Sequence, residues 1–372
     1  MEVSSQSSIE HWFYDPNDTT GGISFFSGRH GWACDNILSH ELILPSGEII
    51  TTSENDHPDL YKALKGAGSS NFGIVTSFIL ETLPLPNKDG LWNEMRSYSW
   101  DKVPALQSAR AKWMTEGIEQ DFDFGGYDVF LYAGIYDMKM VVTQHIHTNH
   151  FSKSEYPEIF KQYRGIETLP EADVRRIQPM SNITLEVAAS SPHGQRNTYA
   201  TFTFKQSEPL EEKLIAILEE GIEKVKGVSG IVAPMIMQPL AKNTLKLMKK
   251  HGGNILGLRE EDGPLAIYII SFSWTDPADD ELLFKVTRDI VERSEEAAKE
   301  AGLWHPFKYV NYAEDWQADG IYPGYGEENF KWLQELQRKY DPEQTFTKGG
   351  LCGGYFRLNE KNGMEGRVRD EL

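Results

Sequence analysis

The stretch GAGSSNFGIVTSF, residues 66–78, joins the signal for a helix to the signal for a strand. The preceding segment PDLYKALK, residues 58–65, begins with proline and is followed by Gly66, an asymmetry that helix termini favour. Because Gly66, Gly68 and Gly73 lack a Cβ, the backbone between them can turn left-handed and lie against a flat, polar molecule. A glycine-rich turn is also a common connection between a helix and a strand. The stretch therefore indicates either a cofactor cradle or a plain turn.

Outward from this stretch, strand and helix signals alternate. HELILPSGEIITT, residues 40–52, predicts two short strands around a Pro-Ser-Gly turn, and the strand after the glycines ends before Pro84. Helical spacing of apolar residues predicts helices at 101–118, 211–227, 278–301 and 327–340. Other apolar segments predict strands at 127–137, 198–205, 231–237, 266–274 and 307–313. No Val- and Ile-rich runs of a parallel sheet occur, so we expect an α+β fold with an antiparallel sheet backed by helices.

The composition limits the classes of function. The 372-residue chain is 40% apolar and 12% aromatic, which is typical of a globular protein with a large core. Its formal net charge of −19 repels phosphate backbones and anionic lipids, so we expect neither nucleic acid nor a membrane as a partner. Cys34 and Cys352 are too few for a disulfide framework or a thiolate metal site. Two separate thiols are favoured over one bridge.

The termini give weak localisation signals. No apolar run has the length of a signal peptide or a membrane span, so the chain as written is expected to be cytoplasmic. The last four residues, RDEL, resemble an endoplasmic-reticulum retrieval tail, and Asn17 and Asn182 each begin an N-x-T triplet. Neither feature acts without an entry signal, and both receive little weight.

Further segments accompany the glycine stretch in a fixed order. They are TTGGISFFSGRHGWACDNI at 19–37, QPL at 238–240, HGGNILGL at 251–258, YVNYAEDWQ at 309–317, YGEENFKWLQELQRKYDP at 325–342 and GGYFRL at 353–358. In this order the segments resemble the fungal FAD-linked oxidases of the vanillyl-alcohol oxidase and berberine-bridge-enzyme type over about residues 20–357. The resemblance implies an oxidoreductase of fungal secondary metabolism that transfers a hydride from a small organic substrate to FAD.

In this family a loop with an arginine, two glycines and a histidine cradles the diphosphate of FAD and often bonds the flavin covalently. No segment here matches that loop, so we expect the N-terminal FAD-binding subdomain to be absent. Losing several charge-assisted hydrogen bonds, each about 1.5–3 kcal/mol, would weaken FAD binding by orders of magnitude. Two alternatives stay open. One is a flavin-free pseudoenzyme or non-redox cyclase or isomerase, and the other is a truncated, non-enzymatic protein that needs a partner or self-associates through exposed surface. A wrongly assigned start codon would give the same sequence.

The resemblance also implies a domain organisation. It predicts a polar leader at 1–19, the C-terminal part of a PCMH-type FAD-binding domain at 20–86, an α+β substrate domain at 87–305, a segment returning to the FAD domain at 306–358 and a tail at 359–372. The first boundary falls at the prolines near residue 86, which cannot donate to a strand ladder. Both ends of the chain are thus expected to build one domain.

Cofactor contacts are implied by the same resemblance. They would come from Gly21, Gly22, Asp35, Gly68, Ile74, Val75 and Asn311. Gly21 and Gly22 would lie close to the isoalloxazine ring and its ribityl chain, and the strand carrying Ile74 and Val75 would meet the adenine end. Glycine suits positions where backbone touches a ligand. Ile74 and Val75 fit plain core packing equally well.

The segment YVNY offers a candidate for the chemistry. As a strand it would direct Tyr309 and Asn311 to one face, where Asn311 could bond the pyrimidine edge of the flavin and Tyr309 could accept a proton from the substrate. A free tyrosine has a pKa near 10, so this catalytic role requires a neighbouring group that lowers it. Simple packing of the two tyrosines is the alternative.

Substrate contacts are implied for Gln238 and Asn254, which lie in segments that line the pocket of the relatives. The nearby His251 precedes two glycines and is expected in a solvated loop. The run HIHTNH, residues 145–150, has three imidazoles but no adjacent carboxylate or cysteine, so it predicts a solvated loop and no metal site. Three tryptophans fit either a planar apolar substrate or the core, namely Trp92, Trp274 and Trp316.

Overall fold

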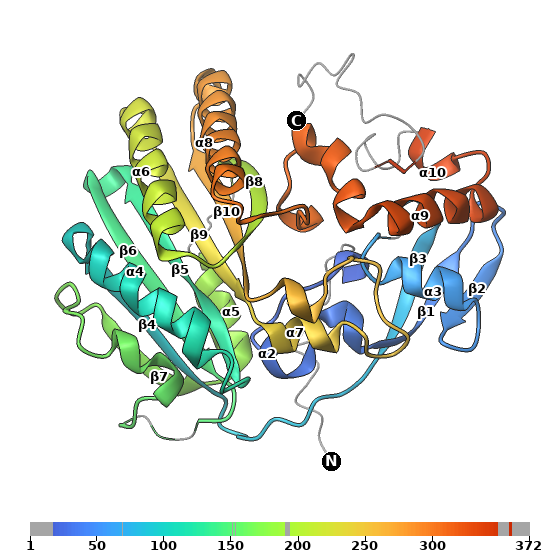
Figure 1. The fold of residues 1–372 in the computed structure, drawn as a ribbon, viewed down its shortest axis with the longest axis horizontal. Coiled ribbons are helices and arrows are strands. Elements are labelled where there is room, and N and C mark those ends of the chain that lie inside the picture. The colour runs from blue at the N-terminus through green and yellow to red at the C-terminus, as the bar shows by residue number, and fades with distance from the viewer. Residues whose placement is uncertain are drawn as a thin grey trace.

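The computed structural model describes residues 18–68, 70–150, 152, 154–189, 194–348 and 357–358 of the chain. These residues form two lobes around two sheets, with the strand orders β2-β1-β3 and β11-β8-β10-β9-β5-β6-β4-β7. Figure 1 shows the three-stranded sheet on the right and the eight-stranded sheet on the left. Most of the predicted leader, Asn17, Cys352, most of GGYFRL and the RDEL tail lie outside the described residues.

The small lobe starts with helical turns and a β-hairpin. Its elements are η1 (Asp18–Thr20), α2 (Ser27–His30), η2 (Ala33–Asn36), β1 (Ile37–Ile43), β2 (Ile49–Ser53), α3 (Pro58–Leu64) and β3 (Ile74–Leu80). β1 pairs antiparallel with both β2 and β3. The predicted hairpin at 40–52, the helix at 58–65 and the strand after the glycines are therefore confirmed.

The large sheet is antiparallel in every pairing that the structure describes. Its strands are β4 (Leu91–Ser99), β5 (Phe124–Ala133), β6 (Met138–His147), β7 (Asp173–Gln178), β8 (Arg196–Lys205), β9 (Val232–Leu240), β10 (Leu265–Trp274) and β11 (Trp304–His305). The strands predicted near 127, 198, 231 and 266 correspond to β5, β8, β9 and β10. The predicted α+β class with an antiparallel sheet backed by helices is confirmed.

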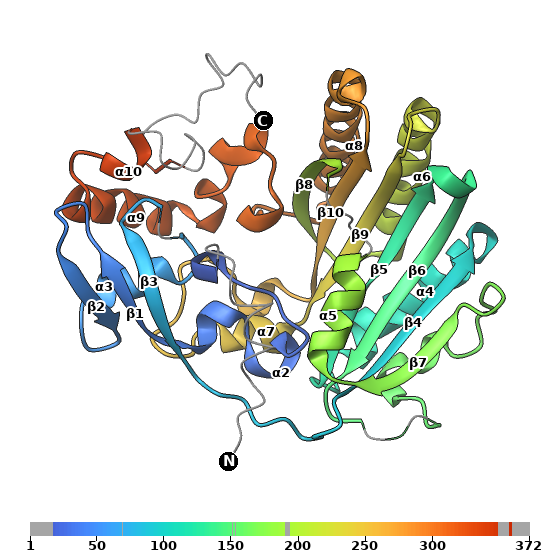
Figure 2. The same ribbon diagram turned by 180° about the vertical axis from the view of Figure 1, so that it is seen from behind.

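Helices α4 (Val103–Lys112), α6 (Glu208–Val225) and α8 (Asp280–Glu300) cover one face of the large sheet (Figure 1). Each corresponds to a helix that the sequence predicted. α4 continues into a π-helical turn, η4 (Trp113–Gly117). α5 (Met180–Ala189) lies on the opposite face, as Figure 2 shows. Trp92 and Trp274 are fully buried in the core, which supports packing over substrate contact for these two rings. None of the helices in the described ranges is long and apolar enough to cross a membrane.

After the large sheet the chain returns to the small lobe. α7 (Lys242–Leu247) leads from β9 into the loop at 248–258. The last elements are η9 (Val310–Tyr312), η10 (Asp315–Gly320), η11 (Pro323–Tyr325), α9 (Glu327–Tyr340) and α10 (Thr345–Lys348). Tyr322 and Tyr325 donate their hydroxyls to the carbonyls of Ala67 and Gly66 at 2.9 and 3.0 Å. The tyrosines of the returning segment therefore fill the inside of the glycine turn.

The predicted strand at 307–313 is wrong. The amide of Tyr312 donates to the carbonyl of Tyr309 at 3.0 Å, which closes a 3₁₀ turn. The strand pairing of this segment with β8 ends at His305, the last residue of β11, so the residues after it are not part of the sheet. The turn places the rings of Tyr309 and Tyr312 4.8 Å apart, edge to face.

The solvated loop predicted at 145–150 is also wrong in part. His145 and His147 belong to β6, and His145 is fully buried. Its Nε2 lies 3.2 Å from a carboxylate oxygen of Asp128 on the neighbouring strand, and its ring stacks on Phe160. In the part of the chain that the structure describes, no three His, Cys, Asp or Glu side chains are arranged to hold a metal ion.

A buried charge network lies between the large sheet and helices α4 and α6. The guanidinium of Arg110 donates to Glu211 at 2.9 Å and to the carbonyl of Met237 at 3.1 Å, and it pairs with Asp128 at 3.5 Å. The hydroxyl of Tyr163 donates to Asp128 at 2.8 Å. The four side chains in this network are at most 2% exposed. Arg110 thus offsets two carboxylates that water cannot reach.

We expect the substitution Arg110→Met to lower the free energy of unfolding by about 3–5 kcal/mol, because it leaves buried carboxylates without a counter-charge. Lys213→Met is the matched control, since this α6 lysine is 55% exposed and pairs with Glu300 at the surface. The control should change stability by less than about 1 kcal/mol. Urea titration of the three proteins measures both effects, and equal losses in the two variants would contradict the role of the network.

Candidate functional site

Residues from an early and a late segment of the chain meet at the hydroxyl of Tyr309. This oxygen accepts hydrogen bonds from the amide of Gly22 at 2.9 Å and from the side chain of Asn311 at 2.7 Å. The hydroxyl of Thr20 in turn donates to the side-chain oxygen of Asn311. Tyr309 is 2% exposed, and desolvation raises the pKa of its hydroxyl well above the usual value. The predicted proximity of Tyr309 and Asn311 is present, but the phenol oxygen is bound by the protein itself.

Gly21 and Gly22 are required by close packing within this junction. A Cβ at Gly21 would lie 2.8 Å from the Trp32 ring and 2.9 Å from the Tyr309 ring, and one at Gly22 would lie 2.5 Å from the Cβ of Ala33. Both glycines also have positive φ, +138° and +86°. Their proposed contact with a flavin stays a prediction, whereas Gly21 packs against the two rings and Gly22 donates to the Tyr309 hydroxyl.

The amides of the glycine turn are used inside the protein as well. Gly66 and Gly68 both donate to the carbonyl of Thr19, at 2.6 and 3.1 Å. Ile74 and Val75 open strand β3, where Ile74 is 52% exposed and Val75 is half-buried. Neither residue lies in the wall of the main cavity. Cofactor binding by these positions stays a prediction.

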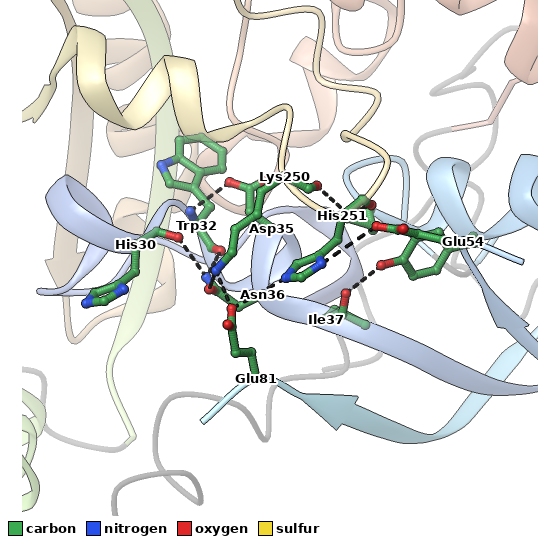
Figure 3. Close-up of polar contacts among 11 residues, drawn as sticks. His30, Trp32, Asp35, Asn36, Ile37, Glu54, Glu81, Lys250 and His251 are labelled. Atoms are coloured by element: carbon green, nitrogen blue, oxygen red, sulfur yellow. Dashed lines mark hydrogen bonds and ion pairs between the residues drawn. The ribbon is translucent and has the colours of Figure 1, made fainter. Parts of the chain in front are cut away.

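Asp35 and Asn254, predicted as a cofactor contact and a substrate contact, bind each other. The carboxylate of Asp35 accepts from the side chain of Asn254 at 2.8 Å. It also accepts from the amide of Trp32 at 2.8 Å (Figure 3). Asp35 is fully buried, and desolvation raises the pKa of its carboxyl to about 6. Asn254 also borders a second, more open hollow of about 660 Å³. This pair therefore joins the loop at 248–258 to the small lobe.

Neighbouring residues strengthen the same attachment (Figure 3). Lys250 donates to Asn36 at 2.8 Å and also pairs with Glu81. His251 lies between two carboxylates, 3.6 Å from Glu54 and 3.4 Å from Glu81. With 27% of its side chain exposed, His251 is partly solvated, as predicted, but its ring lies between these two carboxylates. The loop is thus anchored to the small lobe by the side chains of Lys250 and His251.

A cavity of about 480 Å³ lies on the face of the large sheet that carries α5. Its other wall comes from the segment after Gly22, including Trp32, and from Tyr312. Gln238 lines this cavity, whereas Tyr309 and Asn311 do not, and the contact of Gln238 with a substrate stays a prediction. Tyr312 was not predicted to line the cavity, because a strand at YVNY would point it to the face opposite Tyr309 and Asn311. The 3₁₀ turn is what carries it into the wall.

The polar groups of the cavity are connected. The side chain of Gln238 forms a hydrogen bond with the hydroxyl of Tyr312, whose pKa is raised by burial. Across the sheet, Tyr127 donates to Gln144 at 3.0 Å, and burial raises the pKa of Tyr127 to about 12. The side-chain oxygen of Gln238 is buried and has no hydrogen-bond partner among the described residues. It is therefore available to a donor on a bound molecule.

The sequence is similar to those of fungal FAD-dependent monooxygenases. No protein-family model matches the sequence. An FAD-dependent monooxygenase of Fusarium proliferatum is 35% identical over 339 residues, which cover 88% of this chain and 63% of that protein. An FAD-dependent monooxygenase of Cochliobolus heterostrophus is 34% identical over 350 residues, which cover 91% of this chain and 65% of the relative. The chain thus spans somewhat less than two thirds of the length of these relatives.

The fold is found in solved flavoenzymes. The xylooligosaccharide oxidase of Myceliophthora thermophila, solved in complex with xylobiose, matches with a TM-score of 0.69 and 19% identity over 89% of this chain and 68% of that chain. With the two relatives, this likeness confirms the resemblance that the order of the motifs indicated. The chain is therefore similar in sequence to fungal FAD-dependent monooxygenases and similar in fold to this oligosaccharide oxidase.

The buried carboxyl of Asp35 predicts a pH dependence. Its folded pKa of about 6 lies above the unfolded value of 3.8, so the folded state binds the extra proton. The stability that this group contributes is full below about pH 4 and is lost as the pH rises to about 6, at about 1.4 kcal/mol per pH unit. We therefore expect Asp35→Asn to gain stability relative to the wild type across that window. Thermal or urea unfolding between pH 4 and 7 measures the difference.

The matched control is Asp89→Asn, at an exposed carboxylate outside this cluster. Its stability relative to the wild type should stay constant over the same pH range. A stability difference for Asp35→Asn that does not change with pH would show that the carboxyl does not titrate there.

Proposed function

We propose that this chain is an FAD-linked oxidoreductase of fungal secondary metabolism that oxidises a small organic molecule in the cavity of about 480 Å³. The observation that carries the proposal is the position of this cavity. It lies between the large sheet and the segment from residue 23 to Trp32, beside Tyr312 from the returning part of the chain. The names of the two relatives, both FAD-dependent monooxygenases, support it.

The cavity fits the ring end of FAD better than its diphosphate. Its wall combines apolar side chains with amides and hydroxyls, and none of its described residues is Lys, Arg or His. Such a wall suits an uncharged ring system, and Trp32, Gln238 and Tyr312 are the residues that would hold it. When bound, FAD supplies the acceptor for two electrons.

Tyr312 is the side chain best suited to face the substrate. Because burial keeps its pKa high, its hydroxyl is protonated at neutral pH and can donate a hydrogen bond to a substrate oxygen. Gln238 orients this hydroxyl, and its free oxygen can accept from a substrate O–H or N–H. The geometry favours Tyr312 over Tyr309 for this role, since the Tyr309 oxygen already binds Gly22 and Asn311.

The test is the flavin content and the turnover of purified protein. We expect a yellow flavin spectrum that bleaches when a candidate substrate is added without oxygen. Tyr312→Phe should keep the flavin and lower the rate of bleaching by about 10²–10⁴. Tyr340→Phe is the control, because this tyrosine lies at the surface beside Asp59 and should leave the rate unchanged.

Other results would favour other functions. A rate loss in Tyr309→Phe but not in Tyr312→Phe would return the catalytic role to Tyr309. A colourless monomer that converts a metabolite would instead support a flavin-free cyclase or isomerase. A colourless aggregate would support a non-enzymatic protein.

We also propose that the small sheet associates with a second copy of the chain. Each of its strands exposes a large apolar side chain: Leu38 is 38% exposed, Ile49 63%, Ile74 52% and Ile79 62%. β2 and β3 are the outer strands of this sheet in the described fold. Exposed apolar residues on strands with unpaired edges favour pairing with another sheet.

We expect Ile79→Lys to shift the protein toward the monomer, because a charge on β3 opposes burial of this face. Ile135→Lys is the matched control, since Ile135 is 82% exposed on the large lobe. Light scattering coupled to gel filtration gives the masses over a range of protein concentrations. A wild-type protein that is monomeric at every concentration would rule out the association.

A further inference from the structure

The pairing of the strands arranges the side chains on the floor of the cavity in rows. Ile269 pairs with Ile236, Ile236 with Val129, and Val129 with Val142, so four aliphatic side chains form a strip across four strands. All four line the cavity. The strip is flat and apolar because β-strands place alternate side chains on the same face. It offers a surface for the face of a planar molecule.

Polar groups flank the strip on both sides. On one side, Tyr127 pairs with Gln144, two residues along their strands from the aliphatic strip. On the other side, Ser271 pairs with Tyr199 in the same way. The two polar rows are therefore four residues apart, about 13 Å along the strands. A molecule lying on the strip would meet hydrogen-bonding groups at both of its edges.

The described wall of the cavity carries almost no charge. Glu186 is its one carboxylate, and it pairs with Arg176 and accepts from Gln178 at 3.1 Å. Its side chain is 39% exposed, which places this ion pair at the rim. A charged group moved from water onto the strip would find no counter-charge among these residues. Burying an unpaired charge is strongly unfavourable, whereas a hydroxyl or carbonyl has partners in both rows.

We propose that the cavity selects an uncharged, flat molecule with hydroxyl or carbonyl groups at opposite edges and excludes carboxylates and ammonium ions. This specificity narrows the substrate class of the proposed function. It rests on that function only where the bound molecule is called the substrate. The isoalloxazine ring of FAD has the same chemistry, so the cavity can take either the substrate ring or the cofactor ring.

Equilibrium binding tests the selectivity without requiring turnover. The probes are 2,6-dihydroxynaphthalene, 6-hydroxy-2-naphthoate and 6-hydroxy-2-naphthylmethylammonium, which differ in one substituent, and calorimetry at pH 7 measures their Kd values. We expect the dihydroxy compound to bind at least about 10-fold more tightly than either ion, a difference of about 1.4 kcal/mol. Equal affinity for an ion, or no binding of the dihydroxy compound, would overturn the proposal.

A variant locates the binding in this cavity. Ser271→Lys adds an ammonium to one polar row, where the serine is only half-buried. It should tighten binding of the naphthoate at least about 10-fold and weaken binding of the naphthylmethylammonium. Ile135→Lys adds the same charge to the outer surface and should change neither affinity. If both variants shift the naphthoate equally, the cavity is not the binding site.

Competition with lumiflavin shows whether the aliphatic strip binds the ring of the cofactor or the ring of the substrate. Displacement of 2,6-dihydroxynaphthalene by lumiflavin assigns the strip to the cofactor ring, and simultaneous binding assigns it to the substrate. Both outcomes support an uncharged cavity. A protein that selects the neutral probe but contains no flavin and oxidises nothing would refute the proposed redox function alone.

Discussion

The bond between the hydroxyl of Tyr309 and the amide of Gly22 joins residues that are 287 positions apart in the chain. Asn311 and Thr20 extend this contact, and the Tyr309 ring packs 5.0 Å from that of Trp32. Much of the site depends on this junction. It places the turn carrying Tyr312 beside the segment after Gly22, and together these segments form the wall of the cavity opposite the large sheet.

The large sheet separates two chemically different environments. Along β5, Asp128 points into the helical layer, where it joins Arg110 and His145. Its neighbours Tyr127 and Val129 face the cavity. The alternation along β5 thus places the buried charge of this strand on the helical face and leaves its cavity face uncharged. Mixed charges lie on one side of the sheet, while the cavity on the other side presents hydroxyls, amides and aliphatic groups.

Sequence patterns predicted the fold where they reflect burial of apolar residues. Leu214, Leu218 and Ile222 have helical spacing on α6 because that face packs into the core, and all three are buried. β4 escaped prediction because Asn93 and Glu94 are buried polar residues that interrupt its alternation. His145 was misassigned for the same reason, since its partner Asp128 is on another strand. Pairs of buried polar groups leave no local signal in either segment.

The site was predicted in part. Motif order brought Tyr309, Asn311 and Gly22 together, and it placed Gln238 in the cavity wall. It did not show that Tyr312 faces the cavity, because that depends on a 3₁₀ turn stabilised by contacts with the distant N-terminal segment.

The junction at Tyr309 also constrains synthesis of the protein on the ribosome. At about 5–20 residues per second, the tyrosine emerges about 15–60 s after its glycine partner. Throughout that interval the glycine turn lacks Tyr322 and Tyr325, whose hydroxyls cap its carbonyls in the finished structure. The small lobe is therefore begun first and completed last, and its nascent strands must stay protected while the entire large lobe is translated.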